Sequence, residues 1–487
     1  MKYMTALEEL NLSDNNITNL SFLSDLTNIK KLNISNSNYF ESMNDDVIDI
    51  SVLGKLHELK ELDISGNRIV SLEPLIELKN LRVLNVSNNM IDSFDAIKVM
   101  SNLEQLDISN NPADTLEIGF MNKLTILNAS RTNFKDQNTG LKKLDFQNDN
   151  FFPNLKELNL CKSNLGPMGL SGIKSLAKLE ILDVSACNIS DLTDIGELTN
   201  LKKLSLYNNS VENVNALINL RNLEYLHLGG NLLNDLSPLT ILEKLEYLDL
   251  SDRYSSAALW ESGFVLYNSN KKFTNIMSLG KLKNVTNLHL NNNNIIDIHE
   301  LSKMKQLKYL YLGCNNIDDI TALSALSNLR RVDLSWNKVN DLTPIAYLPL
   351  EYLDVSGNEL LSIKPLKDNT ELKELYCGTC YDMYEKTYDI NSEYYVEDHE
   401  MDNQSDDIND ILNYDIESLF RYRYNFISDL SPLANLKNLT CLNLDGNPIT
   451  DISPLSNLYN LKKLSIVSDF SVIDNWTPVE HVPEIIK

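Results

Sequence analysis

The sequence predicts an α/β solenoid, in which one short strand per repeat builds a parallel sheet and a 3₁₀ or short helix covers the opposite side. Two observations predict this fold class. Segments with the alternation Leu-x-Leu recur along the 487 residues, most of them 22 residues apart. An Asn follows most of these segments at a constant distance. A unit this small must stack on its neighbours to bury its apolar face, so a period near twenty residues is typical of solenoids.

The first strand leucine marks each copy of the unit, and residues 427–464 contain the most regular copy. Alignment on that position predicts nineteen repeats, at Leu10, Leu32, Leu62, Leu84, Leu106, Leu127, Leu158, Leu182, Leu204, Leu226, Leu248, Leu288, Leu310, Val332, Leu353, Leu375, Phe420, Leu442 and Leu464. Within Leu-x-Leu the leucines point inward and the intervening residue points outward, because side chains alternate along a strand.

The Asn after each strand places an amide where the chain turns, so it can bond backbone groups there. We expect a buried ladder at Asn15, Asn67, Asn89, Asn111, Asn209, Asn231, Asn293, Asn315, Asn337, Asn358, Asn425 and Asn447. Ser or Thr followed by Pro, as in Ser237-Pro238, indicates a helix N-cap and first helical position. About seven residues then remain before the next strand, which is enough for a 3₁₀ or one- to two-turn helix.

The motif L-x-x-L-x-L-x-x-N-x-I resembles the leucine-rich repeat, as at Leu223, Leu226, Leu228, Asn231 and Leu233. The extension Asp-[Ile/Leu]-[Ser/Thr]-Pro-Leu, as in residues 235–239, is similar to the short internalin-type class of bacterial surface proteins. A leucine-rich regulatory subunit of protein phosphatase 1 uses the same class. The resemblance implies a horseshoe or arc whose concave sheet binds a protein partner.

The ladder position departs from Asn where extra residues follow. Ser37, Thr132, Ser163, Arg253 and Cys380 replace the Asn, whereas Cys187 does so without an insertion. We therefore expect a solenoid over residues 1–469, with insertions near 38–46, 133–152, 254–271 and 381–407. The gaps at 254–271 and 381–407 fit either loops or degenerate repeats. Residues 470–487 lose the period and are expected to form a C-terminal cap or tail.

The segment from Tyr381 to Asp410 is rich in Asp, Glu and Tyr. Such a composition is typical of a solvated excursion, and the alternative is an acidic, aromatic arm that contacts the partner of the sheet. The chain opens in register with a repeat and without a capping helix. We therefore expect either a piece of a longer protein or a first repeat covered by something else.

The charge favours a protein partner. Lys and Arg total 43 against 68 Asp and Glu, a formal net charge of −25 that repels nucleic acid and anionic lipid. A basic or neutral protein fits better. No signal peptide and no apolar run long enough to span a bilayer are visible, so we expect no membrane insertion. A monomer or a part of a larger chain is expected.

The six cysteines are scattered over five repeats, which favours a reducing, cytoplasmic location; a cell-surface location requires an export signal outside this chain. Cys377-Gly-Thr-Cys380 has the spacing of a redox or zinc pair. However, Cys377 falls on an inward strand position and Cys380 on the ladder position, so both are expected to be core thiols.

The outward strand positions change character near the middle of the chain. Before Asp183 they hold mainly Asn and Asp, which is close to repeat filler, whereas aromatic and imidazole side chains gather after it. Tyr and Trp are enriched at interface hot spots because they bury a large area with little entropy loss. The expected partner-binding residues are Tyr207, Tyr225, His227, Tyr247, His289, Tyr309, Tyr311, Trp336, Tyr352 and Tyr376. The alternative is that these side chains only reflect the preference of strands for aromatics.

His227, Asp249 and His289 lie on adjacent strands if residues 254–271 form a loop. Two His and one carboxylate can bind a divalent metal, but the spacing is not diagnostic and ordinary surface residues are the main expectation. No phosphate-binding loop, G-x-S-x-G or H-E-x-x-H motif is present. We therefore expect no catalytic residues, no cofactor and no metal.

The sequence thus predicts a non-enzymatic scaffold that binds a protein partner on its concave face. Two alternatives follow from the resemblance: a cell-surface adhesin of internalin type, and a phosphatase-regulatory subunit. A metal-binding enzyme is the remote alternative.

Overall fold

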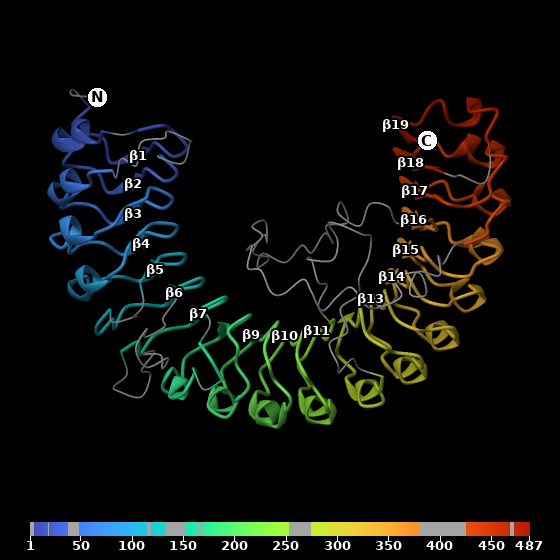
Figure 1. Cartoon of the computed structure of the whole chain (residues 1–487), viewed down its shortest axis with the longest axis horizontal. Coiled ribbons are helices and arrows are strands. Elements are labelled where there is room, and N and C mark those ends of the chain that lie inside the picture. Colours follow the sequence, from blue (N-terminus) through green and yellow to red (C-terminus); the bar gives the residue numbers. More distant parts are fainter. Residues whose placement is uncertain are drawn as a thin grey trace, which may run out of the picture. The chain divides into compact units, whose positions relative to one another are not determined.

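The computed structural model describes residues 4–17, 19–37, 48–113, 118–132, 151–163, 165–167, 169–252, 274–378, 425–467 and 472–487. The chain divides into two compact units, Met1–Leu290 and Asn291–Lys487. In Figure 1 the strands of each unit follow one another along one side of the ribbon, and the 3₁₀ helices follow along the other side. The predicted solenoid of parallel strands and 3₁₀ helices is therefore confirmed in each unit.

Unit 1 contains twelve strands in its described part, and each has three residues. They are β1 Glu9–Asn11, β2 Lys31–Asn33, β3 Glu61–Asp63, β4 Val83–Asn85, β5 Gln105–Asp107, β6 Ile126–Asn128, β7 Glu157–Asn159, β8 Ile181–Asp183, β9 Lys203–Ser205, β10 Tyr225–His227, β11 Tyr247–Asp249 and β12 Asn287–His289. The 3₁₀ helices are η1 Ser21–Asp25, η2 Ser51–Lys55, η3 Glu73–Leu75, η4 Asp95–Val99, η5 Ile173–Ser175, η6 Ile195–Glu197, η7 Asn215–Asn219, η8 Ser237–Ile241 and η10 Leu279–Lys281.

Unit 2 contains seven strands in its described part. They are β13 Tyr309–Tyr311, β14 Arg331–Asp333, β15 Tyr352–Asp354, β16 Glu374–Tyr376, β17 Cys441–Asn443, β18 Lys463–Ser465 and β19 Glu484–Ile486. The 3₁₀ helices are η11 His299–Lys303, η12 Thr321–Ala325, η13 Thr343–Ile345, η14 Lys364–Asp368, η16 Ser431–Leu433, η17 Ser453–Asn457 and η18 Thr477–Val479.

Parallel pairing in register places the strand leucines in one buried row. In unit 1, for example, Leu62 pairs with Leu84, and in unit 2 Leu442 pairs with Leu464. These four side chains are at most 1% exposed. Burying a leucine contributes about 1.5–3 kcal/mol, so each repeat is stabilised mainly by what its neighbours cover. The outward side chains of the strands form the open face of each sheet.

The Asn ladder is confirmed, and Asn89 shows its geometry. Its Nδ2 donates to the carbonyl oxygens of Ile64 and Val86, both at 3.0 Å. Its Oδ1 accepts the backbone N–H groups of Asn67 and Ile69. One amide therefore joins two successive repeats. Asn15 differs from the other expected ladder residues in being exposed.

The predicted ladder substitutes keep part of this bonding. The hydroxyl of Ser163 donates to the carbonyl of Ala129 at 3.0 Å, and the thiol of Cys187 donates to the carbonyl of Leu160 at 2.9 Å. Ser37 and Thr132 likewise donate to the carbonyl three residues earlier. The predicted substitutes Arg253 and Cys380 lie outside the described residues.

The residue before the ladder position adopts a left-handed backbone conformation in most repeats. Gly66 and Gly230 have φ of 66°, whereas Asn88 has φ of 54° and Ala186 of 52°. This conformation is easy for Gly, tolerated by Asn and strained for other residues, so the turn accounts for the frequent Gly or Asn there.

The prediction that Ser or Thr before Pro is the N-cap is wrong. In η8 the N-cap residue is Leu236, without a side-chain cap, and Ser237 is already helical. The carboxylate of Asp235 accepts the backbone N–H of Ser237 at 2.8 Å instead. Asp and Asn side chains commonly accept the backbone N–H of the residue two positions later, so Asp235 takes the role that was predicted for Ser237.

Strand pairing joins the described residues on either side of both long gaps. β11 pairs directly with β12, so Asp249 and His289 lie on neighbouring strands. β16 likewise pairs directly with β17, whereas Phe420, where the sequence predicts a repeat, lies outside the described residues. Asn425 completes the repeat of β16, since its Nδ2 donates to the carbonyl of Cys377 at 2.7 Å. The two halves of this repeat are therefore separated in sequence.

Residues 470–487 are the predicted cap or tail, and their described part, 472–487, contains η18 and β19, of which β19 pairs with β18. The expected insertions near 38–46, 254–271 and 381–407, and most of 133–152, lie outside the described residues. So do Phe420 and the acidic segment from Tyr381 to Asp410.

Candidate binding surface

The predicted binding residues lie in both units, and each group is described separately. The unit-1 aromatic cluster comprises Tyr207, Tyr225, His227, Tyr247 and His289. The unit-2 aromatic cluster comprises Tyr309, Tyr311, Trp336, Tyr352 and Tyr376. Most of these residues belong to strands of the open face, whereas Tyr207 and Trp336 follow β9 and β14.

In the unit-1 aromatic cluster the rings stack across neighbouring strands. The rings of Tyr225 and Tyr247 stack with centroids 4.2 Å apart at an interplanar angle of 12°. Tyr247 also contacts His289 with centroids 5.1 Å apart. Tyr207 stacks on His227 with centroids 4.8 Å apart. Such pairs contribute about 0.5–1.5 kcal/mol beyond the area they bury, so the rings hold one another in place.

Asp249 links the two imidazoles of the unit-1 aromatic cluster. Register pairs it with His227 on one side and His289 on the other. Its Oδ2 lies 3.3 Å from Nε2 of His227, and its Oδ1 accepts the backbone N–H of Ser251 at 2.8 Å. Burial lowers the pKa of His289; the carboxylate of Asp249 opposes this, and His227 adds to it. His289 is therefore held in its neutral form.

In the unit-2 aromatic cluster an arginine lies between tyrosines. The guanidinium carbon of Arg331 lies 4.3 Å from the ring centroid of Tyr352, in cation–π geometry. Tyr352 in turn contacts Tyr376, with centroids 5.5 Å apart. Burial raises the pKa of Tyr311, and Arg331 opposes that rise. The hydroxyl of Tyr311 is therefore neutral at physiological pH.

Trp336 and Tyr376 lie at the edges of the unit-2 aromatic cluster. Trp336 has φ of 55°, and its indole packs so closely on Gly357 that a Cβ there would lie 2.9 Å from the ring. The hydroxyl of Tyr376 donates to Glu374 at 3.2 Å and accepts the thiol of Cys441 at 3.4 Å. Burial is the main cause of the raised pKa of Tyr376.

Sequence reasoning missed Arg331 and placed some residues as more open than they are. Arg331 occupies the strand position just before the central residue, as Tyr309 and Tyr352 do in the neighbouring strands. The equivalence of these three positions is the sequence signal that indicates Arg331. His289 and Tyr352 are each only 7% exposed. Their strand positions indicate that both side chains lie on the open face, but they do not indicate that neighbouring side chains bury them there.

The metal alternative is not supported by the geometry. Although His227, Asp249 and His289 do lie on adjacent strands, the described residues include no group of three or more His, Cys, Asp or Glu side chains arranged to hold a metal ion. Cys377 is fully buried, as expected for a core thiol, and burial raises its pKa. Cys380 lies outside the described residues.

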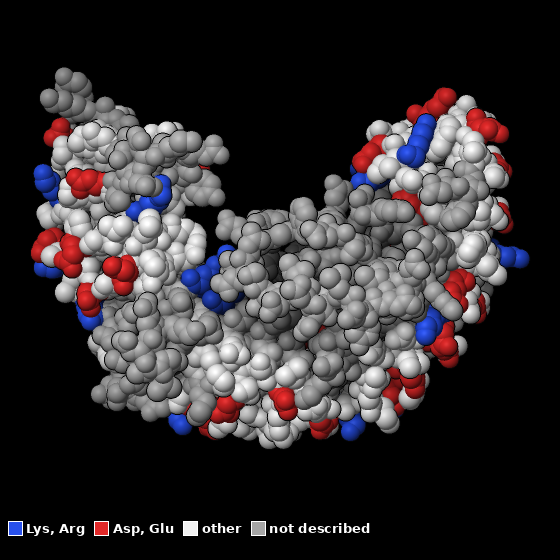
Figure 2. Space-filling model, viewed as in Figure 1, with Lys and Arg blue, Asp and Glu red and all other residues white. Residues whose placement is uncertain are grey.

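The charged side chains visible in Figure 2 are spread along the edges of both units and do not gather into one patch. None of the helices in the described part of the chain has the length and hydrophobicity that a membrane span requires. A separate groove lies on the open face of β1–β6, where the sequence indicated repeat filler.

The parallel three-residue strands, the buried leucine rows and the Asn ladder define a leucine-rich repeat solenoid. Models of the leucine-rich repeat match residues 5–45, 199–241, 283–325, 420–457 and 437–481, residues 57–112, and residues 325–342. Together these matches cover more than half of the 487 residues. The chain belongs to the leucine-rich repeat family.

Solved structures agree with this fold. A leucine-rich repeat protein of Leptospira interrogans has a TM-score of 0.55 at 20% identity, with 98% of this chain and 94% of that chain covered. The functional domain of InlJ from Listeria monocytogenes, which includes a cysteine ladder, has a TM-score of 0.57 at 18% identity, with 85% and 74% covered. The plant peptide hormone receptor RGFR1, solved with RGF2, has a TM-score of 0.52 at 17% identity, with 99% and 86% covered.

The expected likeness to internalins is thus confirmed at the level of the fold. The likeness to the phosphatase subunit stays a prediction. A search of curated proteins finds no significant match to this sequence.

Proposed function

We propose that this chain is a non-enzymatic scaffold that binds a protein partner on the open face of its sheets, through the two aromatic clusters. The observation that carries the proposal is the stack of Tyr225 on Tyr247, with centroids 4.2 Å apart on neighbouring strands. Stacked, half-buried rings offer a flat apolar surface that needs little ordering when a partner covers it. The hydroxyl groups supply hydrogen bonds at its rim.

The composition of the unit-2 aromatic cluster supports the same role. Tyr, Trp and Arg are the side chains most enriched at interface hot spots, and Arg331 lies against Tyr352 there. Fold relatives support interaction in general: RGFR1 was solved in complex with RGF2, and TLR13 with an ssRNA. The net charge of −25 favours a basic or neutral protein over a nucleic acid for this chain.

Binding to a purified partner tests the proposal. Proteins retained by the immobilised chain are identified by mass spectrometry, and the main one is purified and titrated against variants. We expect Tyr225→Ala and Tyr247→Ala each to raise the Kd at least about thirtyfold, which corresponds to a hot-spot loss of about 2 kcal/mol. Tyr347→Ala is the matched control, because Tyr347 is 90% exposed next to η13. Unchanged affinity of both cluster variants, with folding intact by circular dichroism, would contradict the proposal.

We also propose a reducing, cytoplasmic location. Five cysteines of the described chain, Cys161, Cys187, Cys314, Cys377 and Cys441, are free thiols, which supports it. Alkylation of the protein in intact cells, followed by mass spectrometry, is expected to find these thiols reduced. Recovery of the protein in an exported or surface fraction would contradict the location.

A further inference from the structure

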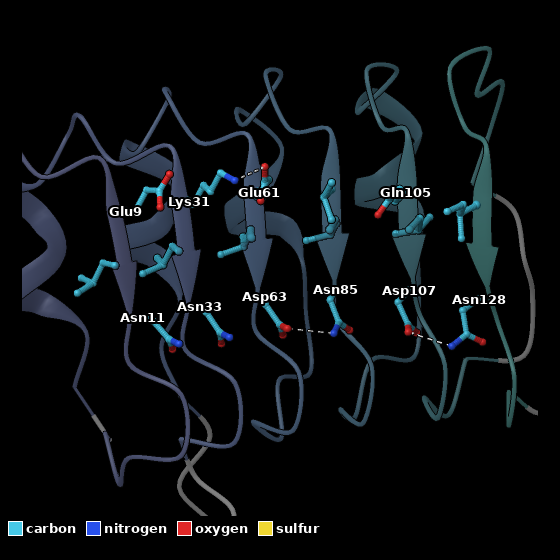
Figure 3. Close-up of a pocket in the computed structure, with 17 residues that line it drawn as sticks. Glu9, Asn11, Lys31, Asn33, Glu61, Asp63, Asn85, Gln105, Asp107 and Asn128 are labelled. Atoms are coloured by element: carbon cyan, nitrogen blue, oxygen red, sulfur yellow. Dashed lines mark hydrogen bonds and ion pairs between the residues drawn. The ribbon is translucent and has the colours of Figure 1, made fainter. Parts of the chain in front are cut away.

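A groove with a volume of about 710 Å³ lies on the open face of β1–β6 in unit 1. Figure 3 shows two rows of side chains that line it, one before and one after the central leucine of each strand. We call it the β1–β6 groove. It shares no residue with the unit-1 aromatic cluster, which lies on β10–β12 and just after β9.

The row after the central leucines is an ordered series of amides and carboxylates. It consists of Asn11, Asn33, Asp63, Asn85, Asp107 and Asn128. In every member Oδ1 accepts the backbone N–H two residues later, at 2.8–3.1 Å. This repeated bond fixes the position of each side chain in the row.

The two carboxylates of this row bond to their neighbours. Nδ2 of Asn85 donates to Oδ2 of Asp63 at 3.1 Å, and Nδ2 of Asn128 donates to Oδ2 of Asp107 at 2.9 Å (Figure 3). An ionised carboxylate accepts up to about four hydrogen bonds, so both groups keep capacity for a further donor.

The other row adds charge on β1–β3 and two apolar side chains on β4 and β6, with Gln105 between them on β5. Glu9, Lys31 and Glu61 occupy β1–β3, and Lys31 lies 3.0 Å from Glu61 in an ion pair. Val83 and Ile126 line the groove on β4 and β6. The groove thus holds four carboxylates, from Glu9, Glu61, Asp63 and Asp107, against one ammonium group. Its charge attracts cations and repels phosphate groups.

We propose that the β1–β6 groove binds an extended segment of a protein partner that carries lysine or arginine side chains. Adjacent strands lie about 4.8 Å apart, so six strands span roughly 24 Å, which an extended segment of about seven residues covers. Long basic side chains lay their aliphatic stems on apolar surface and keep the charged head at polar groups. Val83 and Ile126 lie beside the row that holds Asp63 and Asp107, which suits both parts of such a side chain.

Peptide titration of the full chain tests this inference. The probe is a fluorescein-labelled eight-residue peptide in which arginine alternates with threonine, and the reference peptide has glutamate in place of arginine. We expect the arginine peptide to bind, with affinity that falls as salt rises, and the glutamate peptide not to bind.

Single substitutions then locate the site. Asp63→Asn and Asp107→Asn each keep the Oδ1 acceptor, and Asn already occupies this position at Asn33 and Asn85, so both variants are expected to fold. Each should weaken arginine-peptide binding about fivefold or more. The matched control is Asp183→Asn on β8, whose Oδ1 accepts the backbone N–H of Ser185 in the same way; it should leave binding unchanged.

Three outcomes would overturn the inference: no binding of the arginine peptide at millimolar concentration, equal binding of the glutamate peptide, or equal weakening by Asp183→Asn. The last would show that only the overall charge matters. Tyr225→Ala is expected to leave peptide binding unchanged, so failure here and failure of the aromatic clusters are distinguishable.

Discussion

Asn89→Ala is expected to destabilise unit 1 by more than any exposed Asn substitution. Asn89 is 8% exposed and makes five hydrogen bonds to backbone groups. Removing the amide leaves the N–H groups of Asn67 and Ile69 without this acceptor in a buried turn. An unsatisfied buried group costs about 1–3 kcal/mol, and partial relaxation reduces the sum, so we expect a loss of about 2–4 kcal/mol.

The effect should be local, because repeats of a solenoid interact mainly with their nearest neighbours and long arrays unfold in parts. Hydrogen exchange at the Ile69 amide is therefore the sharper assay, beside urea unfolding followed by circular dichroism. A loss of 2–4 kcal/mol corresponds to roughly 30- to 700-fold faster exchange. Asn89→Ser should fall between wild type and Asn89→Ala, since Ser163 keeps one ladder bond through its hydroxyl.

Asn80→Ala is the control, because Asn80 is exposed and its amide donates only to the carbonyl of His57, at 2.9 Å. It should cost no more than about 1 kcal/mol. If Asn89→Ala costs under about 0.5 kcal/mol and the Ile69 amide stays protected, the ladder does not stabilise the stack as argued.

Four further predictions concern single positions. Ala186→Asn should stabilise the protein by about 0.5–1 kcal/mol in urea unfolding, because φ of 52° is strained for Ala. Gly357→Ala should destabilise it by about 1–3 kcal/mol and shift tryptophan emission, because the new Cβ would lie 2.9 Å from the indole. The hydroxyl and N–H of Ser237 hold the pKa of Asp235 below its ordinary value. The stability that these hydrogen bonds contribute is therefore present above about pH 3.9 and is lost at lower pH. Asp235→Asn should reduce the fall in the urea midpoint between pH 5 and pH 3. Cys377 should resist iodoacetamide at pH 8 in the native protein and react in urea, as mass spectrometry of the alkylated peptide will show.

The regular part of the fold was predictable because its physics is local. Leu-x-Leu alternation and a following Asn specify a strand and a turn within one unit, and the buried ladder at Asn89 or Asn337 follows from the period alone. The sequence predicts a repeat at Phe420, and Asn425 follows it at the distance of a ladder residue. The ladder is satisfied by spatial neighbours, so the strand that Asn425 completes is β16, far away in sequence.

Other differences also have physical causes. Asp235 and Ser237 both belong to residue types that cap helices, so composition alone does not tell which one bonds the free N–H. β19 falls within the predicted cap or tail because Glu484–Ile486 carries Ile at the central position in place of the usual Leu.

The sequence predicts which residues of the candidate site occupy outward strand positions, but it does not predict how their side chains pack. Outward positions follow from strand alternation, which correctly places Tyr225 and Tyr247 on neighbouring strands of one face. Ring stacking, the burial of His289 and the groove of β1–β6 depend on rotamers and on several repeats at once, which a 22-residue period does not encode.

Gly378 and Asn425 belong to one repeat of the solenoid although they lie far apart in the sequence. In the preceding repeat a single residue, Gly357, joins Ser356 to the ladder Asn358, whereas here residues 379–424 occupy that place. The carbonyl of Cys377 still receives its amide, and β17 still pairs with β16. Cys377 and Asn425 therefore meet through one hydrogen bond although they are 48 residues apart in the sequence, and we expect a shorter linker in place of residues 379–424 to leave this bond and the pairing of β16 with β17 intact.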